Sequence, residues 1–253
     1  MAANQVSVEG MLANMRPKAK ACEPAKALAM PEMSFDPIER AAWAEGQVMK
    51  GTARRYYRFR HARFYGGIIS ADAVGCQFLC HWEKGGRCWN FSRNQNPATG
   101  DFFSPDPLAA KLVVLAEKNA CWKFRVSGCE PFLGFLSTAH LYEVISLVRN
   151  KYRASQFVVE SNGAMLGFMP SLLDDFPKGA RLRICLKGQN EAQSEQVTNA
   201  RGAHALQMRA IEEAAKKGIR LTVAAMAGYV DLSKIELPLN AGREMEKLSR
   251  GRA

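Results

Sequence analysis

Short apolar runs and longer amphipathic segments alternate along the chain. Five runs of strand length predict β-strands, because they are apolar and rich in β-branched or aromatic residues; they cover residues 68–74, 122–127, 157–160, 181–186 and 221–226. The segments between them predict helices with one apolar face, at residues 105–119, 136–150 and 206–217. Gly218 directly follows the last of these segments, as expected for a helix end.

This order of elements predicts an α/β fold. Strands that alternate with helices form parallel sheets, because a parallel pair needs a long connection back to the same edge. Residues 235–239 could supply a sixth strand, at an edge of the sheet because Pro238 lacks an amide donor. Such folds place their functional sites at the carboxyl ends of the strands.

The two ends of the chain differ from this central part. Residues 1–35 carry several prolines among Ala, Lys and Met, which predicts a loose segment with short helical turns. Asp36-Pro37 then predicts the N-cap and first residue of a helix that continues to about residue 50. We therefore expect an N-terminal extension over 1–55, a central domain over 56–240 and a basic, partly helical tail over 241–253.

Composition narrows the classes of protein. No apolar run approaches the roughly 18 residues of a membrane span, and the N-terminus lacks the apolar core of a secretory signal. We therefore predict a soluble, cytoplasmic protein with no membrane partner. The net charge of +11 suits an acidic or nucleic-acid partner.

Three of the seven cysteines lie close together after the first predicted strand. Cys76, Cys80 and Cys88 fall within thirteen residues. In a reducing compartment, clustered thiolates favour metal over disulfides, and soft sulfur suits an iron–sulfur cluster or zinc. A zinc loop would use His81 as a fourth ligand. We interpret three other cysteines as structural; these are Cys22, Cys121 and Cys185.

Three further motifs follow the next three predicted strands. They are Ser127-Gly128-Cys129-Glu130-Pro131, Glu160-Ser161-Asn162-Gly163 and Cys185-Leu186-Lys187-Gly188. Together with the cysteine loop, their order resembles the radical S-adenosylmethionine (radical SAM) enzymes. The lead-in at residues 56–67 resembles an uncharacterised, mainly archaeal branch of that superfamily. The resemblance implies a partial, incomplete TIM-type (β/α) barrel of about five to six parallel strands over residues 56–240.

The resemblance also implies the cofactors and the reaction. A 4Fe–4S cluster held by three cysteines binds SAM, and one electron from the cluster cleaves SAM to methionine and a 5′-deoxyadenosyl radical, which takes hydrogen from a substrate. An electron donor is then a second partner, either a reductase, a ferredoxin or a flavodoxin. The sequence does not identify the substrate or a catalytic residue, although the basic composition would suit RNA, an acidic peptide or a phosphorylated metabolite.

Roles of single residues follow from the resemblance too. Glu130 would accept hydrogen bonds from the SAM ammonium group, and Gly128 would let the backbone approach the ligand. Glu160 and Asn162 would bond the ribose hydroxyls. The remaining implied site residues are Ser127, Cys129 as a small filler, Lys187 as a partner of a carboxylate or a surface lysine, and Trp82 as a ring packed on adenine or a wall around the cluster.

The cysteine loop departs from the family pattern at its third ligand. The usual spacing would place a cysteine at position 83, where this chain has Glu83. Two alignments remain open: Glu83 replaces the ligand, or Cys88 supplies it after a short insertion that contains Lys84-Gly85-Gly86. We favour Cys88, because thiolate holds iron of this kind better than carboxylate.

Two other functions compete with the enzyme hypothesis. Arginines at positions 54, 55, 58, 60 and 63 alternate with aromatic residues, a pattern typical of nucleic-acid binding but also of a solvated lead-in to a strand. One alternative is therefore a zinc-stabilised, basic nucleic-acid-binding protein. The other is a degenerate barrel that acts as a scaffold.

Overall fold

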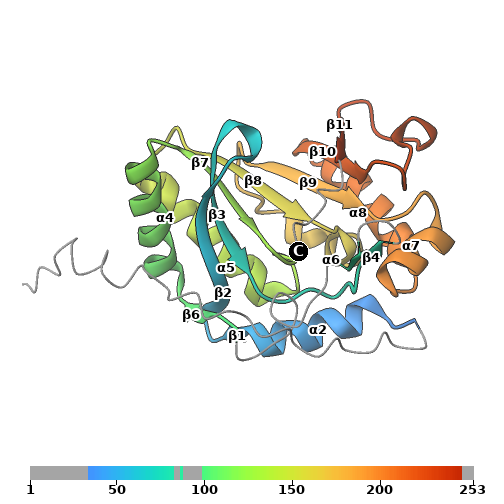
Figure 1. Cartoon of the computed structure of the whole chain (residues 1–253), viewed down its shortest axis with the longest axis horizontal. Helices are drawn as coiled ribbons and strands as arrows, with labels where there is room; N and C mark the ends of the chain where they lie inside the picture. Colours follow the sequence, from blue (N-terminus) through green and yellow to red (C-terminus); the bar gives the residue numbers. More distant parts are fainter. Residues whose placement is uncertain (1–33, 83–85, 88–98, 247–253) are drawn as a thin grey trace, which may run out of the picture.

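The computed structural model describes residues 34–82, 86–87 and 99–246. Its main element is a nine-stranded sheet in which parallel strands follow one another in chain order (Figure 1). These strands are β3 (Ile68–Ala73), β7 (Lys123–Ser127), β8 (Gln156–Ser161), β9 (Arg181–Leu186), β10 (Arg220–Met226) and β11 (Gly242–Glu246). The sheet does not close on itself, so the predicted α/β fold with an incomplete barrel is confirmed.

Antiparallel strands extend the sheet beyond β3. The long strand β2 (Ala53–Ala62) pairs with β3, and β1 (Met49–Lys50) and β6 (Asp101–Phe103) both pair with β2. The arginine-rich lead-in is therefore part of the sheet and not a solvated segment before it. A separate two-stranded ribbon joins β4 (His81–Trp82) to β5 (Gly86–Arg87).

Four predicted helices are confirmed. They are α2 (Pro37–Val48), α4 (Pro105–Asn119), α5 (Phe135–Lys151) and α8 (Ala203–Lys216). Asp36 caps α2 as predicted, since its side chain accepts from the amide of Ile38 at 2.7 Å. The structure adds α6 (Ala164–Phe168), α7 (Glu191–Thr198) and three short 3-10 turns at Phe64–Gly66, Pro170–Leu173 and Leu232–Lys234. None of the helices in the described part of the chain is long and apolar enough to span a membrane.

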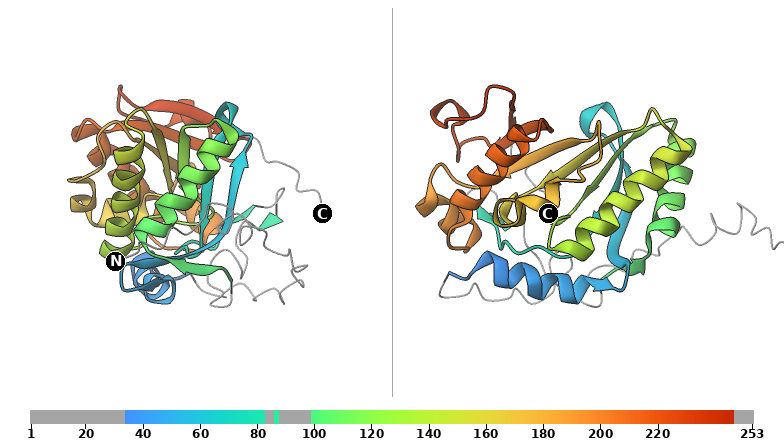
Figure 2. Two further views of the ribbon diagram at one scale, coloured as in Figure 1. Left: turned by 90° about the vertical axis from the view of Figure 1, so that its left-hand side faces the viewer. Right: turned by 180° about the vertical axis from the view of Figure 1, so that it is seen from behind.

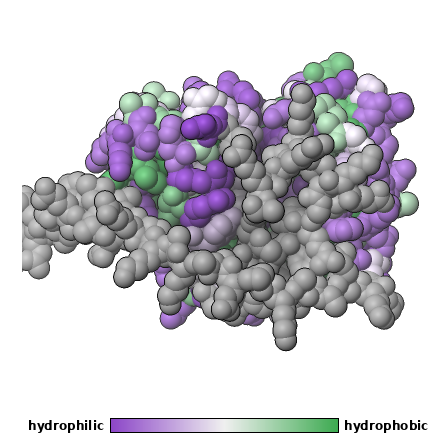
Figure 3. Space-filling view, in the orientation of Figure 1, coloured by the Kyte–Doolittle hydropathy of each residue, from purple (hydrophilic) through white to green (hydrophobic). Residues whose placement is uncertain are grey.

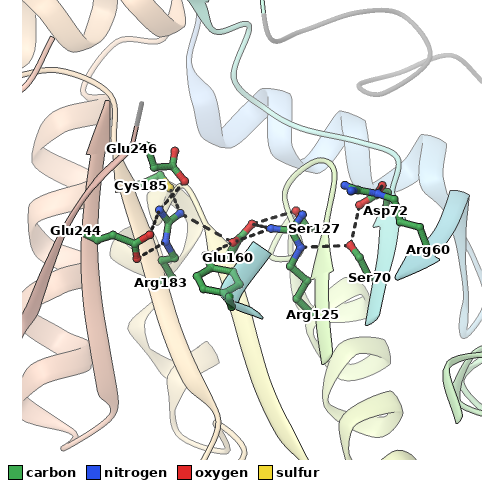
Figure 4. A network of polar contacts seen from close by, with 11 residues as sticks. Arg60, Ser70, Asp72, Arg125, Ser127, Glu160, Arg183, Cys185, Glu244 and Glu246 are labelled. Atoms are coloured by element: carbon green, nitrogen blue, oxygen red, sulfur yellow. Dashed lines mark hydrogen bonds and ion pairs between the residues drawn. The ribbon is translucent and has the colours of Figure 1, made fainter. Parts of the chain in front are cut away.

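The two faces of the sheet differ in chemistry. Helices α4, α5 and α8 cover one face (Figures 1 and 2), and alternate strand residues such as Phe124, Val126 and Val159 are buried there in one hydrophobic core. The residues between them face the other way, because side chains alternate along a strand. Several of these are charged and form the polar network of Figure 4. On the side shown in Figure 3, hydrophilic residues cover most of the coloured surface.

The sixth parallel strand lies later in the chain than predicted. Residues 235–239 are not a strand, whereas Gly242–Glu246 pairs in parallel with β10. The segment expected to be a partly helical tail is therefore β-structure at its start. Arg183 explains the position of β11, because it reaches across β10 to the carboxylates of Glu244 and Glu246.

Candidate functional site

A cavity of about 160 Å³ opens at the carboxyl ends of β3, β7, β8 and β9. Every implied site residue whose side chain the structure describes lies along it. The lining comprises Cys76, Phe78, Cys80, Ser127, Gly128, Cys129, Glu130, Glu160, Ser161, Asn162, Cys185 and Lys187. The motifs that follow four strands in sequence thus meet at one place in the fold.

The cysteine loop is packed against the C-terminal part of the domain. Cys80 is buried in a small apolar cluster with Phe78, Ala164 of α6, Ala203 of α8 and Ala200, which lies between α7 and α8, and Cys76 packs against this cluster. The amide of Leu79 donates to the carbonyl of Thr198 at 3.1 Å. The two sulfurs are therefore held at the cavity, whereas the third implied ligand, Cys88, and its alternative, Glu83, lie outside the described residues.

Glu130 is the most buried acid of the cavity. One of its carboxylate oxygens accepts from Ser161 Oγ at 2.7 Å and from the Phe132 amide at 3.0 Å, and the other accepts from the Asn162 amide at 2.7 Å. A carboxylate has about four acceptor positions, so these three donors leave room for one more. Burial raises the pKa of Glu130 to about 7, although its hydrogen bonds and Arg54 act in the opposite direction.

Arg54 holds the turn that carries Glu130. Its guanidinium is fully buried and donates to the carbonyl of Glu130 at 2.5 Å and to that of Pro131 at 2.6 Å. The amide of Glu130 donates to the carbonyl of Gly75 at 2.9 Å, directly before Cys76. The acid and the cysteine loop are therefore coupled through the backbone. Arg54 is a structural part of the site and not part of an exposed nucleic-acid surface.

Gly128 is required for packing at least as much as for access to a ligand. Its φ of +93° lies in a region that L side chains rarely adopt, and a Cβ there would meet the Cβ of Asp72 at 2.9 Å. The residue lines the cavity as predicted. Its lack of a side chain brings the end of β7 against the end of β3.

Asn162 and Glu160 are engaged by protein groups. The Asn162 amide nitrogen donates to Cys76 Sγ at 3.8 Å, and its side-chain oxygen accepts from Gln77 at 3.1 Å. Both oxygens of Glu160 accept from Arg125 Nη1 at 3.0 Å, while Tyr65 and Ser127 donate to one oxygen each. Burial would raise the pKa of Glu160, but Arg125 and Arg183 hold it below its usual value. A ribose hydroxyl would therefore have to compete with these donors for the carboxylate of Glu160.

Cys185, which we interpret as structural from the sequence, lies in β9 and is partly exposed. Its side chain lines the cavity, and Arg183 Nη1 lies 2.9 Å from its sulfur. Burial raises the pKa of this thiol to about 11, although Lys187 and Arg183 oppose the shift. Ser127, Cys129 and Lys187 lie along the cavity as implied. Trp82 belongs to β4, but its side chain lies outside what the structure describes.

Sequence reasoning named Glu160 but missed the other charged residues on the polar face of the sheet, Asp72, Arg125 and Arg183. The network in Figure 4 runs from Asp72 on β3 through Arg125 and Glu160 to Arg183 on β9. The signal was present, since apolar and polar residues alternate along Phe124-Arg125-Val126-Ser127 and Leu182-Arg183-Ile184-Cys185. Strict alternation predicts one polar face.

Comparison with known proteins does not assign this chain to a family. No family model and no curated protein matches the chain. Among solved structures, the chain is similar to TYW1, a radical SAM enzyme, solved with a lysine–pyruvate adduct bound, at 13% identity and a TM-score of 0.46. The similarity covers 66% of this chain and 58% of that one. Because this likeness is distant, we base the functional proposal on the residues of the site.

The pKa of Glu130 predicts a pH dependence of stability. Its folded pKa of about 7 lies above the ordinary value of 4.5, so the folded state binds the proton more tightly than the unfolded state. This contribution to the free energy of unfolding is present below pH 4.5 and disappears as the pH rises through 7, by up to about 3 kcal/mol. Denaturant unfolding at several pH values, compared with Glu130→Gln, checks this. An unchanged pH profile in the variant would contradict it.

Proposed function

We propose that this chain is a radical SAM enzyme that binds a 4Fe–4S cluster through Cys76, Cys80 and Cys88 and cleaves SAM reductively. The observation that carries the proposal is the meeting of Cys76, Cys80 and Glu130 along one cavity at the carboxyl edge of a parallel sheet. The substrate is not identified by these residues.

The chemistry of the side chains fits both groups. Two thiols on one loop are suitable iron ligands, and Cys88 follows them in the sequence. The unused acceptor position of Glu130 fits an ammonium group, and the approach of a positive charge favours the ionised carboxylate. When bound and reduced, the cluster would supply the electron that cleaves SAM to methionine and a 5′-deoxyadenosyl radical.

The other residues have supporting roles in this proposal. Arg54 fixes the turn that presents Glu130, and Asn162 links Cys76 to the end of β8. Lys187 stands at the cavity, where its charge suits the SAM carboxylate or an anionic substrate group. Phe78 and the alanines behind Cys80 exclude water from one side of the cysteine loop.

Anaerobic reconstitution with iron and sulfide tests the proposal. We expect about four irons per chain, and slow formation of 5′-deoxyadenosine when the loaded protein is reduced with dithionite and given SAM. Glu130→Ala should keep its iron but bind SAM more weakly by about 2 kcal/mol, the worth of a hydrogen bond to a charged group. Iron content, the absorbance of the cluster and equilibrium binding of SAM measure these effects.

The same experiment separates the alternatives. A colourless protein that carries zinc would favour the zinc-stabilised protein. A fully loaded and reduced cluster that never yields 5′-deoxyadenosine would favour a scaffold with no reaction of its own.

A further inference from the structure

Basic side chains gather at the amino edge of the sheet, opposite the cavity. Because the parallel strands all begin at this edge, the segments that lead into them lie side by side, next to the turn between β2 and β3 at the top of Figure 1. Each of these segments contributes at least one basic residue that is exposed or, for Lys123, partly exposed. We call this set the basic edge: Arg63, Lys118, Lys123, Arg153, Lys178, Arg181, Lys217, Arg220 and Arg243.

Most of this positive charge is not neutralised. Among the described residues, Lys217 pairs with Asp174, but no other member of the basic edge makes an ion pair. Arg181 and Arg220 are direct partners across β9 and β10, so two like charges stand side by side. Such repulsion is disfavoured in an isolated sheet and is relieved by a bound anion.

The charge is also unevenly distributed between the two edges. Around the carboxyl edge, the described loops and helix ends carry many acids, namely Asp36, Glu39, Glu45, Asp101, Asp106, Glu191, Glu195, Asp231 and Glu236. The positive charge of the basic edge is therefore not just an even spread of the net charge of +11 over the surface. The basic edge also contains Glu117, Asp174 and Asp175, so it is positive on balance and not of one sign. A surface with net positive charge concentrates partners of the opposite sign.

An aromatic platform lies within the basic edge. Trp122 is 36% exposed and stacks on Tyr152, with 4.0 Å between the ring centroids and 34° between the planes. Lys123 follows Trp122, and Arg153 follows Tyr152. Cations that flank an exposed indole are suited to a chain that alternates phosphates with flat bases. A membrane surface would instead need a broad apolar area for insertion.

We propose that the basic edge binds single-stranded nucleic acid, with phosphates on its arginines and lysines and a base stacked on Trp122. This binding surface is distinct from the cavity and does not depend on the proposed radical chemistry. It also differs from the nucleic-acid surface that the arginine-rich lead-in suggests, because Arg54 is buried and Arg58 and Arg60 pair with Asp72.

Fluorescence anisotropy with a labelled RNA of about 15 nucleotides, near the upper site size of a single-strand-binding module, tests the proposal on the full chain. The test variant combines Arg153→Gln, Arg181→Gln and Arg220→Gln. The matched control combines Lys50→Gln, Arg201→Gln and Arg209→Gln, which removes the same charge from exposed positions outside the basic edge. Melting curves of all three proteins show whether each variant is folded.

We expect the parent and the control to bind RNA, and the test variant to bind at least about tenfold more weakly at low salt. The dependence of log affinity on log salt should fall in slope by about 2 in the test variant, since each contact with single-stranded phosphate contributes about 0.7. Trp122→Leu should weaken binding about fivefold or more even at high salt, because stacking is not screened.

Three results would overturn the proposal. One is that the folded parent does not bind RNA. Another is that the test variant and the control lose the same affinity for RNA. The third is equal binding of the parent to phosphatidylserine vesicles together with no effect of Trp122→Leu on RNA, which would indicate a general anion surface.

Discussion

Alanine at Cys76 or at Cys80 should abolish the iron–sulfur cluster of the reconstituted protein. Both sulfurs lie along the cavity, and the loop that carries them is anchored on the carbonyl of Thr198 and on α8. A three-cysteine cluster that loses one thiolate loses the geometry that holds its iron. We expect the iron content to fall from about four per chain to near zero in each variant.

Cys121→Ala is the matched control, because Cys121 lies before β7 at the opposite edge of the sheet, where its thiol donates to the carbonyl of Lys123 at 3.9 Å. It should keep full iron. Cys88→Ala and Glu83→Ala extend the series to the third ligand, where loss of iron in one but not the other decides between the two alignments. Full iron in both Cys76→Ala and Cys80→Ala would contradict the cluster assignment.

The sequence predicts most of the fold where one face of an element is apolar. Strands such as β7 and β8 and helices such as α4 and α5 bury regular apolar positions, and these elements appear close to their predicted bounds. The common location of the candidate motifs follows from the same reasoning, whereas the roles of their residues are implied by the family resemblance. Once the strands are parallel, whatever follows their carboxyl ends must meet at one edge.

Three of the missed elements, β2, β11 and α7, lack a regular apolar face. In β2, the buried positions include Arg54, whose charge hides the alternation of the strand. In β11, the sequence Gly242–Glu246 has no buried apolar residue at all. Helix α7 is similarly polar and is placed by its contacts with α8. Periodicity cannot find elements that are held by charge or by backbone pairing.

The surroundings of Cys185 could not be predicted for a related reason. The apolar residues around it suggest a strand buried on both faces, so a cysteine there looks like a small core residue. In the structure, Leu182, Ile184 and Leu186 face the helices, and Arg183 and Cys185 face the polar side. On the polar side, Arg183 pairs with Glu160 and with Glu244 of β11. Both acids are more than twenty residues away from it in the sequence. Local sequence does not reveal such contacts.

Replacement of Arg183 by methionine should destabilise the protein strongly and release β11 from the sheet. The Arg183 side chain is only 2% exposed and pairs with Glu244 at 3.1 Å and with Glu246 at 2.5 Å. It crosses β10 at Ala224, the residue that pairs with Cys185 on one side and Glu244 on the other. Loss of the guanidinium leaves three carboxylates near one another without their shared cation, since Glu160 lies 4.0 Å from Arg183 as well.

Breaking a fully buried ion pair typically costs about 3–5 kcal/mol. Because Glu244 and Glu246 are each 39% exposed and can be solvated by water, we expect a smaller loss, of about 2–3 kcal/mol, in urea unfolding of Arg183→Met. Hydrogen exchange should rise in residues 242–246 before it rises in β7 or β8, because β11 pairs with β10 alone. Arg181→Met is the control on the same strand, since Arg181 is exposed and makes no ion pair among the described residues. Equal stability of the two variants would mean that backbone pairing alone holds β11 and that the charged network contributes little to closing this edge of the sheet.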